Sequence, residues 1–186
     1  MTSSGDIRHH EEELLAIRAQ NGDRAAFAAL MDRHERRLVY YLLRLVNDAH
    51  TALDVAQDVW LTVFRQLHSL NAPEAFRVWL YRIAHDKAMT WIRRERREAD
   101  LYASYACEVV TETEGFDLHF DDAEAVHWAL GRLPLDQREA LTLRFLEGLS
   151  LEQMSEVLCC PIGTAKSRLH YAQHAIREEL EKHVHE

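Results

Sequence analysis

The stretch from Leu149 to Leu180, LSLEQMSEVLCCPIGTAKSRLHYAQHAIREEL, decides how the C-terminal third of the chain folds. Ser150 followed by Gln153 forms a capping box, which predicts that a helix begins there. This helix ends near Leu158, and Pro161 can take the first position of the next helix because the N–H that proline lacks is unpaired at that position anyway. A short helix, a tight turn and a longer helix have the spacing of a helix-turn-helix.

The second of these helices has an apolar and a cationic face. At 100° per residue, one face carries Ala165, Leu169, Ala172, Ile176 and Leu180. The opposite face carries Lys166, Ser167, His170, His174 and Arg177, with Tyr171 beside them. A major groove admits such a helix, and phosphates attract its charges. A solvated helix packed in a small bundle has the same pattern, so the pattern alone leaves both interpretations open.

The composition predicts an all-α protein. Six glycines and three prolines in 186 residues are too few for an all-β sandwich or barrel, which needs frequent turns. No apolar run is long enough to span a membrane, and the polar N-terminus has no signal-peptide core. We therefore expect no membrane insertion and a cytoplasmic location. The three cysteines, an odd number, do not form a disulfide framework.

The negative charge is concentrated in one segment. The formal net charge is −9, and the stretch from Glu98 to Gly131 contains nine acids and no lysine or arginine. The other 22 acids balance the 22 lysines and arginines of the whole chain. Helical periodicity also fails over residues 98–122. The sequence therefore predicts two small helical domains, residues 1–97 and 123–186, joined by an acidic linker.

The N-terminal domain contains a helix, residues 54–68, with a mixed outer face. Its predicted inner face carries Ala56, Val59, Trp60, Val63 and Leu67. Its outer face carries Asp54, Gln57, Asp58, Leu61 and Arg65. A leucine among charges suggests a surface that binds a partner, although isolated surface leucines are normal.

The next predicted helix, residues 76–97, begins with aromatic residues and ends with four arginines in five positions. Arginines at a helix C-terminus suit the helix dipole, and they also suit phosphate binding. Aromatic rings beside a basic cluster are typical of single-strand binding. Trp79 and Ile83, however, are in phase with the core, which favours packing over base stacking for these two residues.

Several motifs occur together along nearly the whole chain. They are Asp54-Val-Ala-Gln-Asp-Val-Trp-Leu61, Phe76-Arg-Val-Trp-Leu-Tyr-Arg-Ile-Ala84, Leu133-Pro134, Gly148-Leu-Ser-Leu-Glu152 and Cys160-Pro-Ile-Gly-Thr-Ala-Lys-Ser-Arg-Leu169. In this order they closely resemble bacterial sigma factors of the extracytoplasmic-function (ECF) group. The resemblance implies a dissociable promoter-specificity subunit of RNA polymerase, with a sigma region 2 bundle, a short linker and a sigma region 4 helix-turn-helix.

The resemblance also implies partners and site residues. The expected partners are the clamp helices and flap of core RNA polymerase, promoter DNA and an anti-sigma factor. The positions that correspond to the clamp-binding face are Asp54, Gln57, Asp58, Leu61 and Arg65. Those implied for the minus-ten element are Asn71, Phe76, Arg77, Asp86, Arg93, Arg94 and Arg97. Those implied for the minus-thirty-five element are Thr164, Lys166, Ser167, Arg168, His170, Tyr171 and His174.

The linker and three single positions add further expectations. In related proteins this linker threads toward the active centre of the polymerase, and its acids would suit a basic channel; a flexible tether is the alternative. Asp86 stands where relatives often carry a neutral amide, and Tyr171 where an arginine is frequent. Cys159 replaces a glycine often found in the helix-turn-helix turn, so that turn must contain a strained left-handed residue or follow a different path.

Three other functions fit parts of the sequence. His85-Asp86 could belong to a helical metal-dependent phosphohydrolase, but that site needs further ligands. Cys159 and Cys160 lack the spacer that paired zinc ligands use. A stand-alone helix-turn-helix regulator would bind palindromes as a dimer and would not need the N-terminal partner face. The sequence therefore predicts no catalytic residue, metal or cofactor, and leaves the stand-alone regulator as the alternative.

Overall fold

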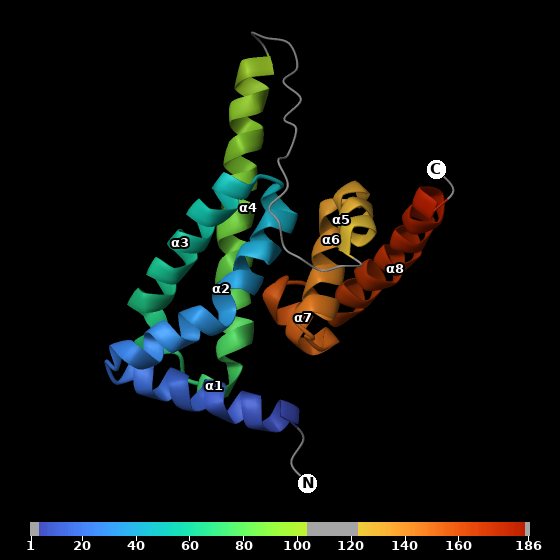
Figure 1. The fold of residues 1–186 in the computed structure, drawn as a ribbon. Coiled ribbons are helices and arrows are strands. Elements are labelled where there is room, and N and C mark those ends of the chain that lie inside the picture. Colours follow the sequence, from blue (N-terminus) through green and yellow to red (C-terminus); the bar gives the residue numbers. More distant parts are fainter. Residues whose placement is uncertain (1–3, 104–122, 185–186) are drawn as a thin grey trace.

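The computed structural model describes residues 4–103 and 123–184, which are helical over most of their length (Figure 1). The N-terminal part consists of α1 (Ser4–Gln20), α2 (Arg24–Val46), α3 (Ala49–Gln66), the short 3-10 turns η1 (Leu67–Ser69) and η2 (Pro73–Ala75), and α4 (Phe76–Ala103). The C-terminal part consists of α5 (Ala123–Arg132), α6 (Leu135–Leu141), the π-helical turn η3 (Thr142–Leu146), α7 (Leu151–Val157) and α8 (Ile162–Val184). The described residues contain no strand, which confirms the predicted all-α fold.

The breaks between the N-terminal helices lie where capping ends one helix and starts the next. Gly22, with φ 88°, separates α1 from α2. Asn47 takes the left-handed conformation (φ 58°) at the end of α2, and its N–H donates to the Leu43 carbonyl. Asp48 then caps α3, because its carboxylate accepts a hydrogen bond from the Thr51 N–H at 2.6 Å. This bond lowers the pKa of Asp48.

The helix predicted over residues 54–68 buries the expected face. Residues 54–66 belong to α3, which packs between α2 and α4, and Leu67 and His68 belong to the 3-10 turn η1. The buried side chains of this face are Ala56, Val59, Trp60, Val63 and Leu67. A loop after α3 is held by α1, since the Gln20 side-chain amide donates to the carbonyls of Leu67 at 3.0 Å and Leu70 at 2.6 Å.

The C-terminal part contains the predicted helix-turn-helix. Ser150 Oγ accepts from the Gln153 N–H at 3.2 Å, and the Gln153 side chain accepts from the Ser150 N–H at 2.9 Å, which confirms the capping box. Cys159 takes the left-handed conformation with φ 49°, the strained alternative expected in the absence of glycine. The Pro161 carbonyl accepts the N–H of Ala165, so Pro161 lies one residue before α8 rather than at its first position.

The predicted start of the acidic linker is wrong. The helix α4 continues to Ala103, so Glu98 and Asp100 are helical. Glu98 accepts a hydrogen bond from Nε of Arg94 at 2.7 Å, a contact between positions four residues apart that stabilises the helix beyond residue 97. The remainder of the linker, residues 104–122 with Cys107, lies outside the described residues.

The two helical parts share a hydrophobic core, which the sequence did not indicate. The helix α6 packs against α2, and α7 packs against α4 (Figure 1). Buried residues of α2, α3 and α4 form one cluster with residues of the C-terminal part, among them Ala140, Leu143, Leu149 and Met154. A smaller cluster of Leu130, Leu133, Leu141 and Ala172 holds α5 and α6 against α8. The periodicity of a helix identifies its buried face but not the element that covers it.

The stability of the fold should depend on pH through the buried Glu147. Burial raises the pKa of Glu147, and the Tyr81 hydroxyl and nearby cationic side chains only partly offset this effect. A raised pKa means that the folded protein binds the proton more tightly than the unfolded chain. Proton binding by Glu147 therefore stabilises the folded protein fully below the ordinary pKa of 4.5, and this stabilisation is lost as the pH rises through the folded-state pKa.

We therefore expect Glu147→Gln to flatten part of the pH dependence of stability. The difference in unfolding free energy, variant minus wild type, should increase from about pH 4 to about pH 8. Urea unfolding at a series of pH values measures it. A difference that stays constant, or that changes in favour of the wild type with rising pH, would contradict this assignment.

Candidate functional site

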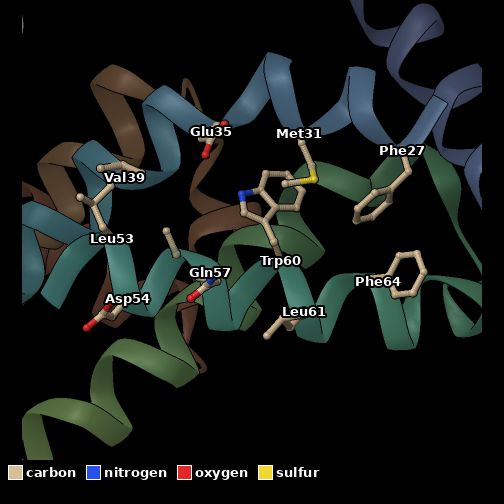
Figure 2. A pocket seen from close by; sticks show the side chains of 11 residues that line it. Phe27, Met31, Glu35, Val39, Leu53, Asp54, Gln57, Trp60, Leu61 and Phe64 are labelled. Carbon is tan, nitrogen blue, oxygen red and sulfur yellow. The ribbon is translucent and has the colours of Figure 1, made fainter. Parts of the chain in front are cut away.

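The outer side of α2 and α3 contains an apolar groove of about 480 Å³ (Figure 2). The side chains that line it come from both helices: Phe27, Met31, Glu35, Val39, Leu53, Asp54, Ala56, Gln57, Trp60, Leu61 and Phe64. Figure 2 shows Phe27 and Phe64 facing each other at one end and Val39 and Leu53 at the other. The groove is therefore an elongated surface between two helices, with acidic or amide groups along its edge.

Large apolar side chains in this groove are exposed to solvent. Phe64 is 63% exposed, Leu61 47% and Leu53 46%. The ring of Phe27 makes edge-to-face contacts with Phe64, at 5.3 Å between ring centroids, and with Trp60, at 6.2 Å. A contiguous apolar surface of this kind is typical of an interaction site, whereas scattered surface leucines are not.

The floor of the groove also carries an unused hydrogen-bond donor. Nε1 of Trp60 is buried and has no hydrogen-bond partner among the described residues. A buried tryptophan N–H normally finds an acceptor. This nitrogen is enclosed beneath the floor of the groove, so the exposed apolar walls are what the groove offers to an incoming partner.

Three of the five residues predicted for polymerase binding line this groove: Asp54, Gln57 and Leu61. Asp58 and Arg65 are exposed on the same helix but do not line it. Sequence reasoning missed the wall contributed by α2, including Phe27 and Met31, and it missed Phe64. Phe64 follows the buried Val63 directly, so its position on the outer face of the helix was the available signal.

The residues predicted for the minus-ten element lie on and before α4. Asn71, Asp86, Arg93, Arg94 and Arg97 are exposed, and Arg77 is half-buried. Within this set Arg94 is bonded to Glu98, and Nε of Arg93 donates to the Met89 carbonyl at 3.0 Å. The structure therefore leaves four of the charged positions and one amide on the surface of the N-terminal part.

The interpretation of Phe76 as a base-contacting residue is wrong for this structure. Its side chain is 0% exposed and belongs to the core. The ring packs against His34 at 5.7 Å and Trp79 at 6.3 Å between centroids. Phe76 begins α4 and faces inward, so it fixes the start of that helix and cannot stack on a base.

The outer face of α8 presents the residues predicted for the minus-thirty-five element. Lys166, Ser167, His170, Tyr171 and His174 are exposed, and Thr164 and Arg168 are half-buried. The rings of His170 and Tyr171 lie 5.7 Å apart, and those of His170 and His174 lie 6.3 Å apart. The guanidinium of Arg168 is 3.7 Å from Asp136 of α6. Hydrogen-bonding and aromatic groups thus form one surface along the helix, opposite its buried alanines.

The structure adds no support for the metal-dependent phosphohydrolase or for a zinc site. Within residues 4–103 and 123–184, no helix is long and apolar enough to cross a bilayer, and no three metal-ligating side chains converge. Nδ1 of His85 is hydrogen-bonded to Glu139 at 2.7 Å, whereas the adjacent Asp86 is exposed. The His85-Asp86 pair therefore does not form part of a ligand cluster among these residues.

Comparisons with known proteins agree with this arrangement. Residues 30–98 match the family model for sigma-70 region 2, and residues 123–172 match the model for sigma-70 region 4. The RNA polymerase sigma-H factor of Pseudomonas aeruginosa is 33% identical, over 94% of this chain and 96% of its own length. The ECF RNA polymerase sigma-E factor of Escherichia coli K12 is 31% identical, over 91% and 94%. The chain belongs to the ECF sigma factors.

Solved structures are similar to this sigma factor as well. The sigma factor RpoE of Bartonella quintana, co-crystallised with the anti-sigma factor NepR, superposes with a TM-score of 0.71 at 25% identity, over 83% of this chain and 96% of that chain. CnrH, in complex with the cytosolic domain of CnrY, shares the fold with a TM-score of 0.68, over 92% and 98%. The helix-turn-helix thus belongs to sigma region 4, and the α2–α3 groove lies within sigma region 2.

The strained turn of region 4 gives a stability prediction. A residue with a Cβ costs about 1–2 kcal/mol in the left-handed conformation, and glycine avoids this cost. Cys159→Gly should raise the free energy of unfolding by about 1 kcal/mol, since glycine's greater freedom in the unfolded chain offsets part of the gain. Thermal denaturation measures this change. Cys159→Ala, which keeps the Cβ, is the control and should not stabilise; equal effects of the two substitutions would contradict the explanation.

Proposed function

We propose that this sigma factor binds core RNA polymerase through the α2–α3 groove. The groove is the observation that carries the proposal, because it brings the exposed side chains of Leu53, Leu61 and Phe64 together on one surface. Its elongated apolar floor suits an amphipathic helix laid along it, a mode of recognition based on apolar anchors at helical spacing. The clamp helices of the polymerase are the proposed occupant, and Asp54 and Gln57 at the edge would set its register. Region 4 would dock on the polymerase flap.

The promoter contacts are assigned to two surfaces. The surface proposed to meet the melted minus-ten strand comprises Asn71 before α4, the half-buried Arg77, and the exposed Asp86 and arginines 93, 94 and 97 of α4. The outer face of α8 is proposed to enter the major groove at the minus-thirty-five element, with Lys166 and His170 as donors and Tyr171 as an apolar or hydrogen-bonding contact. The first surface belongs to a region 2 domain whose last helix, α4, ends at Ala103, the second to a region 4 domain starting at residue 123.

Regulation and location follow from the same role. The related RpoE was crystallised with an anti-sigma factor, and we propose that an anti-sigma factor likewise binds this chain and blocks polymerase binding. The chain would act in the cytoplasm as an initiation factor and not as a catalyst. The stand-alone regulator is not favoured, because region 2 and its groove would have no role in such a protein.

The groove assignment predicts that Leu61→Asp weakens binding to core RNA polymerase at least about tenfold. A carboxylate placed under a docked helix would be desolvated without a partner, and each tenfold corresponds to about 1.4 kcal/mol. Fluorescence anisotropy of labelled sigma factor titrated with purified core enzyme measures the affinity.

Leu14→Asp is the matched control, because Leu14 is 59% exposed on α1 and does not line the groove. It should bind core polymerase as the wild type does. Equal affinities of the wild type and Leu61→Asp would show that the groove is not the contact surface.

The α8 assignment predicts that Lys166→Ala weakens promoter binding by the holoenzyme. If Lys166 contacts a base, its loss should cost about 1–3 kcal/mol of binding free energy and relax the sequence preference at the upstream element. If it contacts a phosphate, its loss should weaken binding equally for all sequences and reduce the salt dependence of binding. Gel-shift titrations with wild-type and scrambled minus-thirty-five elements separate the two cases. Lys182→Ala, an exposed lysine at the far end of α8, is the control; if the two variants behave alike, Lys166 does not contact DNA.

A further inference from the structure

The loop between α3 and α4 is tied to α1 by one side chain. This loop, residues 67–75, consists of η1, three connecting residues and η2. Nε2 of Gln20, the last residue of α1, donates to the Leu67 carbonyl at 3.0 Å and to the Leu70 carbonyl at 2.6 Å. The Leu70 N–H also donates to the Leu67 carbonyl, at 3.1 Å. The two bonds from Gln20, the Gln20 clip, therefore bridge both ends of one closed turn.

The helix α1 that carries the clip is itself anchored. Ala16 is fully buried, and α1 packs on both α2 and η2. Glu11 accepts a salt bridge from Arg33 of α2 at 2.8 Å, and the Glu12 carboxylate lies 3.1 Å from Nε2 of the buried His34. Figure 1 shows α1 lying across the start of α4. The clip thus connects the loop to a fixed part of the N-terminal domain.

The clip also sets the direction of the chain at Asn71. The Leu70 carbonyl and the Asn71 N–H belong to one planar peptide unit, so a hydrogen bond that orients the carbonyl orients the whole unit. At the other end of the loop, the buried ring of Phe76 packs on His34 at 5.7 Å between centroids. The backbone of residues 70–75 is therefore fixed at both ends.

Asn71 is the side chain of this loop best suited to read a base. Within residues 70–75, the exposed side chains are Asn71 and Glu74, and the others are half-buried. A side-chain amide both donates and accepts, which lets it distinguish the edges of different bases. The carboxylate of Glu74 only accepts, and its charge repels phosphates. The group that the clip holds in place is therefore the one with base-reading chemistry.

We propose that Gln20 is a positioning residue for base selection at the minus-ten element, because it holds the backbone from which Asn71 contacts the melted strand. A contact made from a backbone that is already held loses less conformational freedom on binding and favours one base geometry over the others. Gln20 precedes residues 30–98, the part that matches the region 2 family model. The effect on base selection rests on the proposed function, whereas the clip itself does not.

Four variants separate the clip from the general packing of α1. Gln20→Met keeps the length of the side chain and removes the donor, and Gln20→Glu places an acceptor against the two carbonyls. Gln20→Lys supplies donors again and should rescue the clip. Asn21→Ala is the matched control, because the Asn21 amide donates to the Ile17 carbonyl of its own helix at 2.8 Å. Circular dichroism verifies that each variant is helical.

Hydrogen exchange in the free full-length protein tests the clip. The amides of residues 67–75 should exchange at least about threefold faster in Gln20→Met and Gln20→Glu, since the loop opens more often when its tie to α1 is lost. Exchange within α1 should stay as in the wild type. Gln20→Lys and Asn21→Ala should keep the wild-type rates in the loop. Equal loop exchange in the wild type and both donor-free variants would overturn the clip.

Transcription initiation by the holoenzyme, on a promoter pool randomised at each minus-ten position, tests base selection. Asn71→Ala identifies the position that the loop reads. The preference for the best over the worst base at that position should fall at least about threefold in Gln20→Met and recover in Gln20→Lys. The minus-thirty-five preference should not change. Combining Gln20→Met with Asn71→Ala should cause no further loss at that position, because Gln20 acts through Asn71.

Three outcomes would contradict the positioning role. Faster loop exchange together with wild-type base preferences would overturn it. A general loss of initiation without a change in preference would also overturn it, because a merely structural role of Gln20 predicts that result. If Asn71→Ala keeps the wild-type preferences, the minus-ten assignment of the loop is wrong and the base-selection role of Gln20 falls with it, while the exchange rates still decide whether the clip exists.

Discussion

The helices α3 and α8 each bury one face in the core, and the buried face decides which side chains the other face presents. In α3 the buried stripe includes Val59 and Val63, which leaves Leu61 and Phe64 on the outside beside α2. In α8 the buried alanines leave polar and aromatic side chains outside. The groove and the polar outer face of α8 therefore exist because the opposite sides of the same helices are needed for folding.

The interface between the two domains contains buried charged residues as well as apolar ones. Its core is continuous with that of region 2, yet it contains the carboxylates Glu139 and Glu147 at positions where a permanent core would favour apolar residues. Buried carboxylates make an interface specific in geometry and sensitive to the loss of single donors.

Local features of the fold could be predicted from the sequence, and long-range ones could not. The capping box at Ser150 is as predicted, and Cys159 takes the strained one of the two turn conformations that were expected; both features depend on neighbours within a few residues. Phe76 was misassigned because an aromatic residue at the start of a helix can face either way. The α2 wall of the groove and the partners of Glu139 depend on contacts between residues far apart in the sequence, which helical periodicity does not encode.

The central claim is that this chain directs RNA polymerase to a defined set of promoters. Run-off transcription with purified core polymerase on a pool of genomic fragments, followed by sequencing of the transcript starts, tests it most directly. The account predicts starts that require the chain and that share one sequence element near −10 and another near −35. Transcripts that are the same with and without the chain, or starts without common upstream elements, would contradict it.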